Sequence, residues 1–161
     1  MGQQKRLAQF GIVVVLTVIF QLVLIAVDLR QTPVRTAEEF VRNYYYMDPA
    51  MGEQMCTALS ANGEAVADYL YSVTENAAQR GFSIKFVRRM FTELHVETIS
   101  NDGAAAKVHV SGETRTAINP VYMVIGKLFH LGEYHPVDLT LDLIKDKGQW
   151  RVCGGVPGFD S

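Results

Sequence analysis

The chain opens with a long uncharged segment before amphipathic patterns begin. From Leu7 to Val27 no residue is charged, and only two glutamines and a threonine are polar. About twenty helical residues, at 1.5 Å each, cross a hydrocarbon core of about 30 Å. This pattern predicts a transmembrane helix that contacts membrane lipid through residues 7–27.

A cleaved secretory leader is the alternative interpretation of this segment. A leader has a shorter apolar region, about 7–15 residues, followed by small residues at a cleavage site. Here the run ends in LIAVDLRQ, which lacks such a site, so a retained anchor is expected. Lys5 and Arg6 precede the run, and a short basic head normally stays in the cytoplasm. We therefore expect a single-pass protein of the inner cell membrane whose C-terminal domain lies on the periplasmic, extracytoplasmic side. The opposite orientation is the alternative.

The residues after this segment have a helical period. QTPVR, residues 31–35, is a predicted linker. Thr36 forms a capping box with the glutamate three residues later and begins a first helix. Asp48, followed by proline, begins a second helix of about ten residues. Asn62 begins a third helix, which stops at Gly81.

Beyond the third helix the period changes to two. TELHVETIS, AAAKVHVSGETRTAI, VDLTLDLI and QWRVC are predicted strands, whereas FSIKFVRRMF is ambiguous between a strand and a short helix. NDG and KDKG are predicted hairpin turns. Apolar and polar residues alternate in AAAKVHVSGETRTAI and VDLTLDLI. The apolar residues expected to point inward are Ala106, Val108, Val110, Val137, Leu139, Leu141 and Leu143.

Helices segregated from an antiparallel sheet predict an α+β fold. We expect an N-terminal transmembrane helix followed by three helices packed on a curved antiparallel sheet. The predicted organisation is a cytoplasmic stub and anchor at 1–30, the linker at 31–35, an α+β domain at 36–154 and a flexible tail at 155–161. About 130 residues after the anchor suffice for one domain with a core and are too few for two.

The first helices and the last strand carry a family resemblance. TAEEFVRNYYYMDPAMGEQMCTAL comes first, another helix follows, and long hairpins end in K-x-x-G-x-W-x-V, here KDKGQWRVC. Over residues 36–154 this order resembles the nuclear transport factor 2-like superfamily, which implies a cone-shaped α+β domain. Its membrane-anchored members in bacterial envelopes include an assembly factor of type IV secretion systems and proteins that accompany lipid-import complexes. Its isomerase-like and dehydratase-like enzymes place Asp, Tyr or His inside the cone, where this chain is expected to place Ala, Val and Leu.

Charge and cysteine content narrow the classes of function. Beyond residue 31 the chain has 12 Lys and Arg against 16 Asp and Glu, a formal charge of −4. A mildly acidic domain without a basic patch predicts no nucleic-acid partner. Cys56 and Cys153 can form a disulfide in an exported domain, and the alternative is two small buried hydrophobic side chains.

Two polar groups are candidates for chemistry, and both have plainer interpretations. His130, Glu133 and His135 are zinc-ligand types, but their spacing fits no zincin pattern and a glycine between them indicates a loop. No metal and no cofactor is therefore expected. The tyrosines at 44–46 with Asp48 suggest an acid/base site, yet on an amphipathic helix such tyrosines more often pack with their hydroxyls at the rim.

The polar face of the VDLTLDLI strand carries two further carboxylates. Asp138 and Asp142 lie on the side of the strand opposite to its inward leucines. Because side chains alternate across a strand, these two aspartates are expected to face solvent.

The connection PVYMVIGKLFHLG is unusually apolar. A long apolar loop in a compact domain is typically functional or covered by something. In one interpretation the segment extends the sheet or plugs the cone. In the other it forms a contact surface for a partner membrane protein or for the bilayer face. The proposed contact residues are Val121, Tyr122, Met123, Ile125, Leu128 and Phe129.

These observations predict a non-enzymatic envelope protein. Its domain would dock onto other membrane-complex subunits or a second copy of itself, or hold a small apolar ligand in the cone. The alternative function is a small-molecule enzyme of the isomerase or dehydratase kind, with its site inside the cone.

Overall fold

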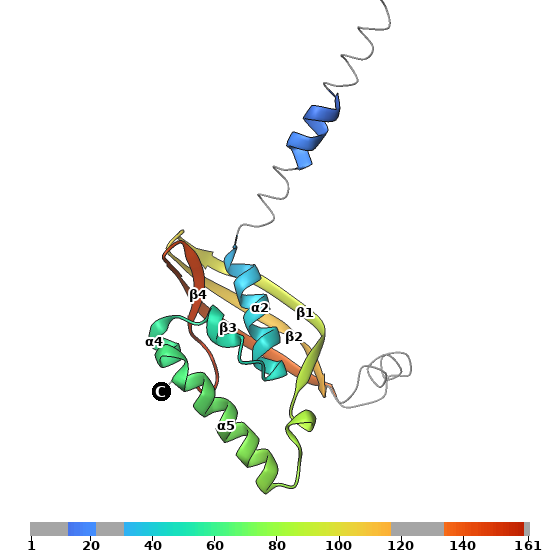
Figure 1. The fold of residues 1–161 in the computed structure, drawn as a ribbon, viewed down its shortest axis with the longest axis vertical. Helices are drawn as coiled ribbons and strands as arrows, with labels where there is room; N and C mark the ends of the chain where they lie inside the picture. The colour runs from blue at the N-terminus through green and yellow to red at the C-terminus, as the bar shows by residue number, and fades with distance from the viewer. Residues whose placement is uncertain (1–12, 22–30, 117–133, 160–161) are drawn as a thin grey trace, which may run out of the picture. The chain divides into compact units, whose positions relative to one another are not determined.

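The computed structural model describes residues 13–21, 31–116 and 134–159 (Figure 1). The chain divides into two compact units, Met1–Gln31 and Thr32–Ser161. The predicted apolar contact segment at 121–129 lies outside the described residues.

The first unit contains a described helical segment at residues 13–21. Across the described ranges, the structure has no helix with the length and apolar character needed to cross a membrane. This finding overturns the prediction of an N-terminal transmembrane helix through residues 7–27. Positions 7–12 and 22–27 of that prediction lie outside the described residues.

Helix α2, Pro33–Tyr46, begins earlier than the sequence pattern predicted. Thr32 caps it by accepting the backbone N–H of Arg35, and Pro33 occupies its first turn, where a missing N–H is harmless. Thr36, the predicted cap, is instead buried in the helix interface. The predicted linker at 31–35 is therefore largely helical.

The second predicted helix is wrong, because it is split at Met55 and Cys56. Both residues are extended, Met55 forms a parallel bridge with Val152, and the Cys56 N–H donates to the Val152 carbonyl at 2.8 Å. Pairing with a strand is incompatible with helical backbone geometry, so the helix is interrupted there. The resulting elements are α3 at Met51–Gln54, α4 at Thr57–Ser60, η1 at Ala61–Gly63 and α5 at Glu64–Gln79.

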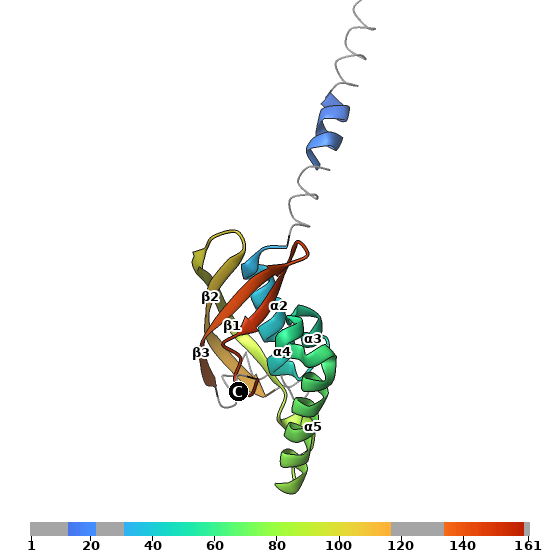
Figure 2. The same ribbon diagram turned by 90° about the vertical axis from the view of Figure 1, so that its left-hand side faces the viewer.

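The four-stranded sheet is an antiparallel meander in the order β1-β2-β3-β4 (Figures 1 and 2). The ambiguous segment FSIKFVRRMF contains a short 3-10 helix, η2, and then the start of β1. Both predicted hairpin turns are confirmed, at Asn101–Gly103 and at Lys147–Gly148. The bounds are η2 at Ile84–Phe86, β1 at Arg89–Asn101, β2 at Ala105–Thr116, β3 at His135–Asp146 and β4 at Gln149–Gly154.

Helix α2 lies against one face of the sheet and closes the core (Figure 2). The predicted inward alternation is confirmed, since Val108, Val110, Leu141 and Leu143 are at most 1% exposed and Leu139 packs against the same cluster. A sheet with one covered face requires this alternation, because successive side chains point to opposite faces.

The residues after β4 complete the core, although the sequence suggested a flexible tail at 155–161. Val156 is fully buried, and the Phe159 ring lies 4.8 Å from the Tyr69 ring, centroid to centroid. Gly155 has a φ of +74°, and a Cβ there would collide with the Thr140 carbonyl. As far as Phe159, this segment is part of the packed domain.

Candidate functional site

The space between α2 and the sheet, where a cone-type active site would lie, is filled by apolar side chains. Five large apolar side chains in this space are at most 2% exposed: Phe40, Met51, Met55, Leu141 and Leu143. Dense filling of this kind leaves the described interior as a structural core.

Tyr44 is the polar side chain that reaches into this core from α2. Its ring stacks on Phe40 and Tyr69, and its hydroxyl donates to the Pro157 carbonyl at 2.8 Å. Burial is the main cause that raises the pKa of Tyr44 far above its usual range, and a hydrogen bond with Tyr69 raises it further. A neutral, buried phenol that already donates to a backbone carbonyl acts as a packing group and not as a base.

The other members of the Tyr44–Asp48 group do not converge on one point. Tyr45 packs edge-on against Phe91. Burial raises the pKa of Tyr45, and the nearby positive charge of Arg89 offsets part of this increase. The Asp48 carboxylate accepts the N–H of Ala50 at 2.9 Å and so organises a turn. The packing interpretation is therefore confirmed for Tyr44 and Tyr45.

The two predicted solvent-facing aspartates are confirmed on the outer face of β3. The side chains of Asp138 and Asp142 are 81% and 53% exposed. Asp142 forms an ion pair with Lys107 at 3.1 Å, whereas Asp138 lies 3.9 Å from His109. Exposed pairs of this kind contribute little to stability.

The histidine cluster is only partly described. His130 and Glu133 lie outside the described residues, and the His135 carbonyl at the start of β3 accepts the Thr114 hydroxyl. Among residues 31–116 and 134–159, no group of three His, Cys, Asp or Glu side chains is arranged to hold a metal ion.

The two cysteines lie at disulfide distance, as the sequence suggested. Cys56 and Cys153 are bonded, with their Cα atoms 5.3 Å apart and a sequence separation of 97. The bond links the break between α3 and α4 to the last strand.

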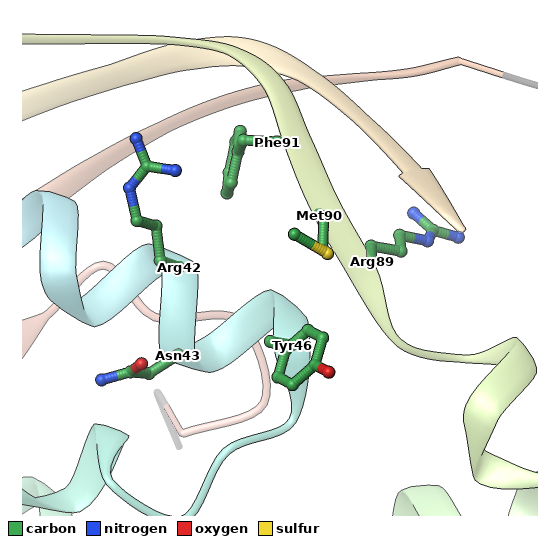
Figure 3. A pocket seen from close by; sticks show the side chains of 6 residues that line it. All are labelled: Arg42, Asn43, Tyr46, Arg89, Met90 and Phe91. Carbon is green, nitrogen blue, oxygen red and sulfur yellow. The ribbon is translucent and has the colours of Figure 1, made fainter. Parts of the chain in front are cut away.

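An apolar recess of about 240 Å³ opens between the C-terminal half of α2 and the start of β1. Figure 3 shows Met90 and Phe91 on the side of β1 that faces α2, with Tyr46 at the end of α2 opposite Met90. Met90 is 38% exposed and Tyr46 is 39% exposed, so their apolar atoms are accessible from outside. The lining residues are Arg42, Asn43, Tyr46, Arg89, Met90 and Phe91.

Arginines surround this recess. Arg42 is paired with Glu38 at 2.8 Å, one helical turn away. The Arg88 guanidinium lies over the Tyr46 ring, 5.1 Å from its centroid, within the range of a cation–π contact. Figure 3 shows the Arg89 guanidinium directed away from Met90. The recess therefore has an apolar floor, and the Arg88 guanidinium lies next to one of its lining residues, Tyr46.

Sequence reasoning missed this recess. Its signal is the RRMF stretch at 88–91, where two arginines precede two large apolar residues. The contribution of Tyr46 depends on tertiary contact, because it lies more than 40 positions earlier in the chain.

No protein-family model, curated protein or solved structure matches this chain. The resemblance to the nuclear transport factor 2-like superfamily stays a prediction.

Proposed function

We propose that the domain from Thr32 to Phe159 is a non-enzymatic docking module that binds a partner protein at the recess between α2 and β1. The observation that carries the proposal is the accessible apolar surface of Tyr46, Met90 and Phe91 beside a filled core. Large apolar side chains are normally buried, and an accessible cluster in a concave site is typical of protein contacts.

The size of the recess favours a protein side chain over a whole ligand. Its volume of about 240 Å³ is below the range of about 300–1,000 Å³ that holds most small molecules. Protein interfaces are anchored by one or two aromatic or aliphatic side chains that enter well-packed pockets. A docking role therefore accounts for the recess better than a small apolar ligand does.

The bonded cysteines support an extracytoplasmic site of action. Disulfides persist in oxidising compartments and are rare where thiols are kept reduced. The Cys56–Cys153 pair is therefore consistent with a partner in the periplasm or outside the cell.

The apolar segment at 121–129 remains a second proposed contact surface. The segment itself lies outside the described residues. It follows β2, whose last residue Thr116 pairs with Arg89 at the recess. The position of Thr116, the last described residue before the segment, is the reason to keep the segment in the proposal.

Two matched substitutions test the docking role. Met90 on β1 and Ile144 on β3 are exposed to a similar extent, 38% and 41%, but only Met90 lines the recess. A partner is first captured with the full chain, identified by mass spectrometry and purified, and its affinity for each variant is then measured by calorimetry. We expect Met90→Asp to weaken binding at least about tenfold, because it introduces a charge into an apolar anchor site, and Ile144→Asp to leave it unchanged. Equal effects of the two substitutions would reject the recess as the binding site.

A further inference from the structure

Arg88 differs from other arginines of this domain in its surroundings. Arg42 is paired with Glu38, and Arg151 donates to the backbone carbonyls of Glu53 and Met55. Among the described residues, no carboxylate forms an ion pair with Arg88, and its Nε atom is buried without a hydrogen-bond acceptor. Buried polar atoms nearly always have a partner, so this exception calls for an explanation.

The guanidinium of Arg88 is oriented by an aromatic ring and not by an acid. It lies over Tyr46, and stacking on a ring leaves the N–H groups at the guanidinium edge available to an acceptor. Tyr46 also lines the recess. An acceptor that reached Arg88 would therefore lie beside the apolar floor made by Tyr46, Met90 and Phe91.

The local charge favours an anionic acceptor. The residues that line the recess include Arg42 and Arg89 and no carboxylate, and Arg42 is paired with Glu38 one helical turn away. The local cationic character contrasts with the formal charge of −4 for the chain beyond residue 31. A carboxylate is the acceptor that best matches a guanidinium, because the hydrogen bonds are charge-assisted and fit its planar fork.

We infer that the recess recognises an acidic–aromatic peptide segment of the partner protein. In this arrangement an aromatic or large aliphatic side chain contacts Tyr46, Met90 and Phe91, and a neighbouring carboxylate accepts hydrogen bonds from Arg88. The inference rests on the proposed docking function and specifies the chemistry of its partner.

A pair of dipeptides isolates the carboxylate. Acetyl-Asp-Phe-amide and acetyl-Asn-Phe-amide have nearly the same shape and differ in charge. Each is titrated into the ¹⁵N-labelled full chain, and the shifts of the Tyr46 and Met90 backbone amide signals are followed by nuclear magnetic resonance. We expect the Asp peptide to bind about tenfold more tightly than the Asn peptide, the advantage typical of a hydrogen bond to a charged group.

Variants assign this preference to Arg88. Arg88→Gln should remove the difference between the two peptides, and Arg88→Lys, which keeps the charge and loses the planar fork, should retain only part of it. Lys107→Gln removes a positive charge on the outer face of β2 and should leave the preference intact. Met90→Asp should weaken the binding of both peptides.

The outcomes separate this inference from the docking proposal. If both peptides shift the recess signals with equal affinity, the recess binds peptides but the carboxylate preference is wrong. If neither peptide shifts those signals at millimolar concentration, both the acidic–aromatic inference and the docking recess are rejected. An Asp preference that survives Arg88→Gln would overturn the role assigned to Arg88.

Discussion

The two edges of the sheet are closed in very different ways. At the β4 edge, Val152 is bridged by Met55, Cys153 is bonded to Cys56, and Arg151 donates to the Glu53 carbonyl at 2.8 Å. At the β1 edge, a strand of 13 residues has no described strand on its outer side. One edge is fixed by covalent and backbone bonds, whereas the other is open.

The open edge is also protected against unspecific strand pairing. Register shifts interrupt the β1–β2 ladder between Phe91 and Glu93 and between Thr98 and Ser100. Such irregularities, together with exposed charges, keep an edge strand from pairing with arbitrary strands. The β4 edge is therefore held by bonds that support stability, whereas the β1 edge carries the recess that we propose for docking.

Loss of the disulfide is the largest expected change. Its two cysteines are 97 residues apart, and a loop of that length gives about 3–5 kcal/mol of stabilisation in the chain-entropy account. We expect Cys56→Ala/Cys153→Ala to lower the free energy of unfolding by that amount, measured by urea denaturation of the full chain. The wild type under reducing conditions serves as the control and should lose a similar amount. Unchanged unfolding in both samples would contradict the role of the β4 edge.

Removal of the Tyr44 hydroxyl should have a smaller effect. Tyr44→Phe keeps the ring packing but deletes the hydrogen bond to the Pro157 carbonyl. We expect a loss of about 1 kcal/mol in the free energy of unfolding at neutral pH. A loss within measurement error would show that this bond does not fix the last residues on the core.

The same substitution predicts a difference at alkaline pH. Burial raises the pKa of folded Tyr44, while an unfolded tyrosine ionises near pH 10. The stabilising contribution is therefore complete below about pH 10 and is lost as the pH rises further, because only the unfolded state releases the proton. We expect wild type to lose more stability than Tyr44→Phe between about pH 9 and pH 11, measured by denaturant titration. Parallel losses would contradict burial of the ionisable hydroxyl.

Met90→Asp should have the smallest effect on stability. Met90 is partly exposed at the open edge, and surface substitutions usually change the free energy of unfolding by less than about 0.5 kcal/mol. Thermal and urea denaturation of the variant test this expectation. A loss above about 2 kcal/mol would indicate that the recess belongs to the structural core.

The strand pattern and the main core residues were predictable from the sequence. The inward positions of β2 and β3 follow from strict alternation, as Val108 and Leu141 show by their burial. The hairpin turns followed from NDG and KDKG, whose glycines adopt positive φ, a conformation that glycine adopts at little cost.

The remaining errors come from contacts between distant segments. The second helix was predicted as continuous because its local pattern is helical, but the bridge from Met55 to Val152 interrupts it. Glycine-rich residues after β4 suggested a tail, yet Val156 is fully buried within the core cluster. The membrane-span prediction is a separate case, because the uncharged segment at 7–27 meets a length criterion that no described helix meets.

The recess was not predictable by the same reasoning. Periodicity assigns a residue to a face of its own element, whereas the Arg88–Tyr46 contact joins a helix end to the residue before a strand. Only the folded arrangement brings a guanidinium, a ring and two large apolar side chains together.

Site-specific photo-crosslinking in the native cell tests the central claim most directly. A benzoylphenylalanine is placed at Tyr46 in the recess or at Ile144 on the outer face of β3, which are similarly exposed, and adducts are identified by mass spectrometry. The docking account predicts one defined partner adduct at position 46, attached near an acidic residue of that partner, and none at position 144. An adduct of the same partner at position 144 with none at position 46 would contradict it.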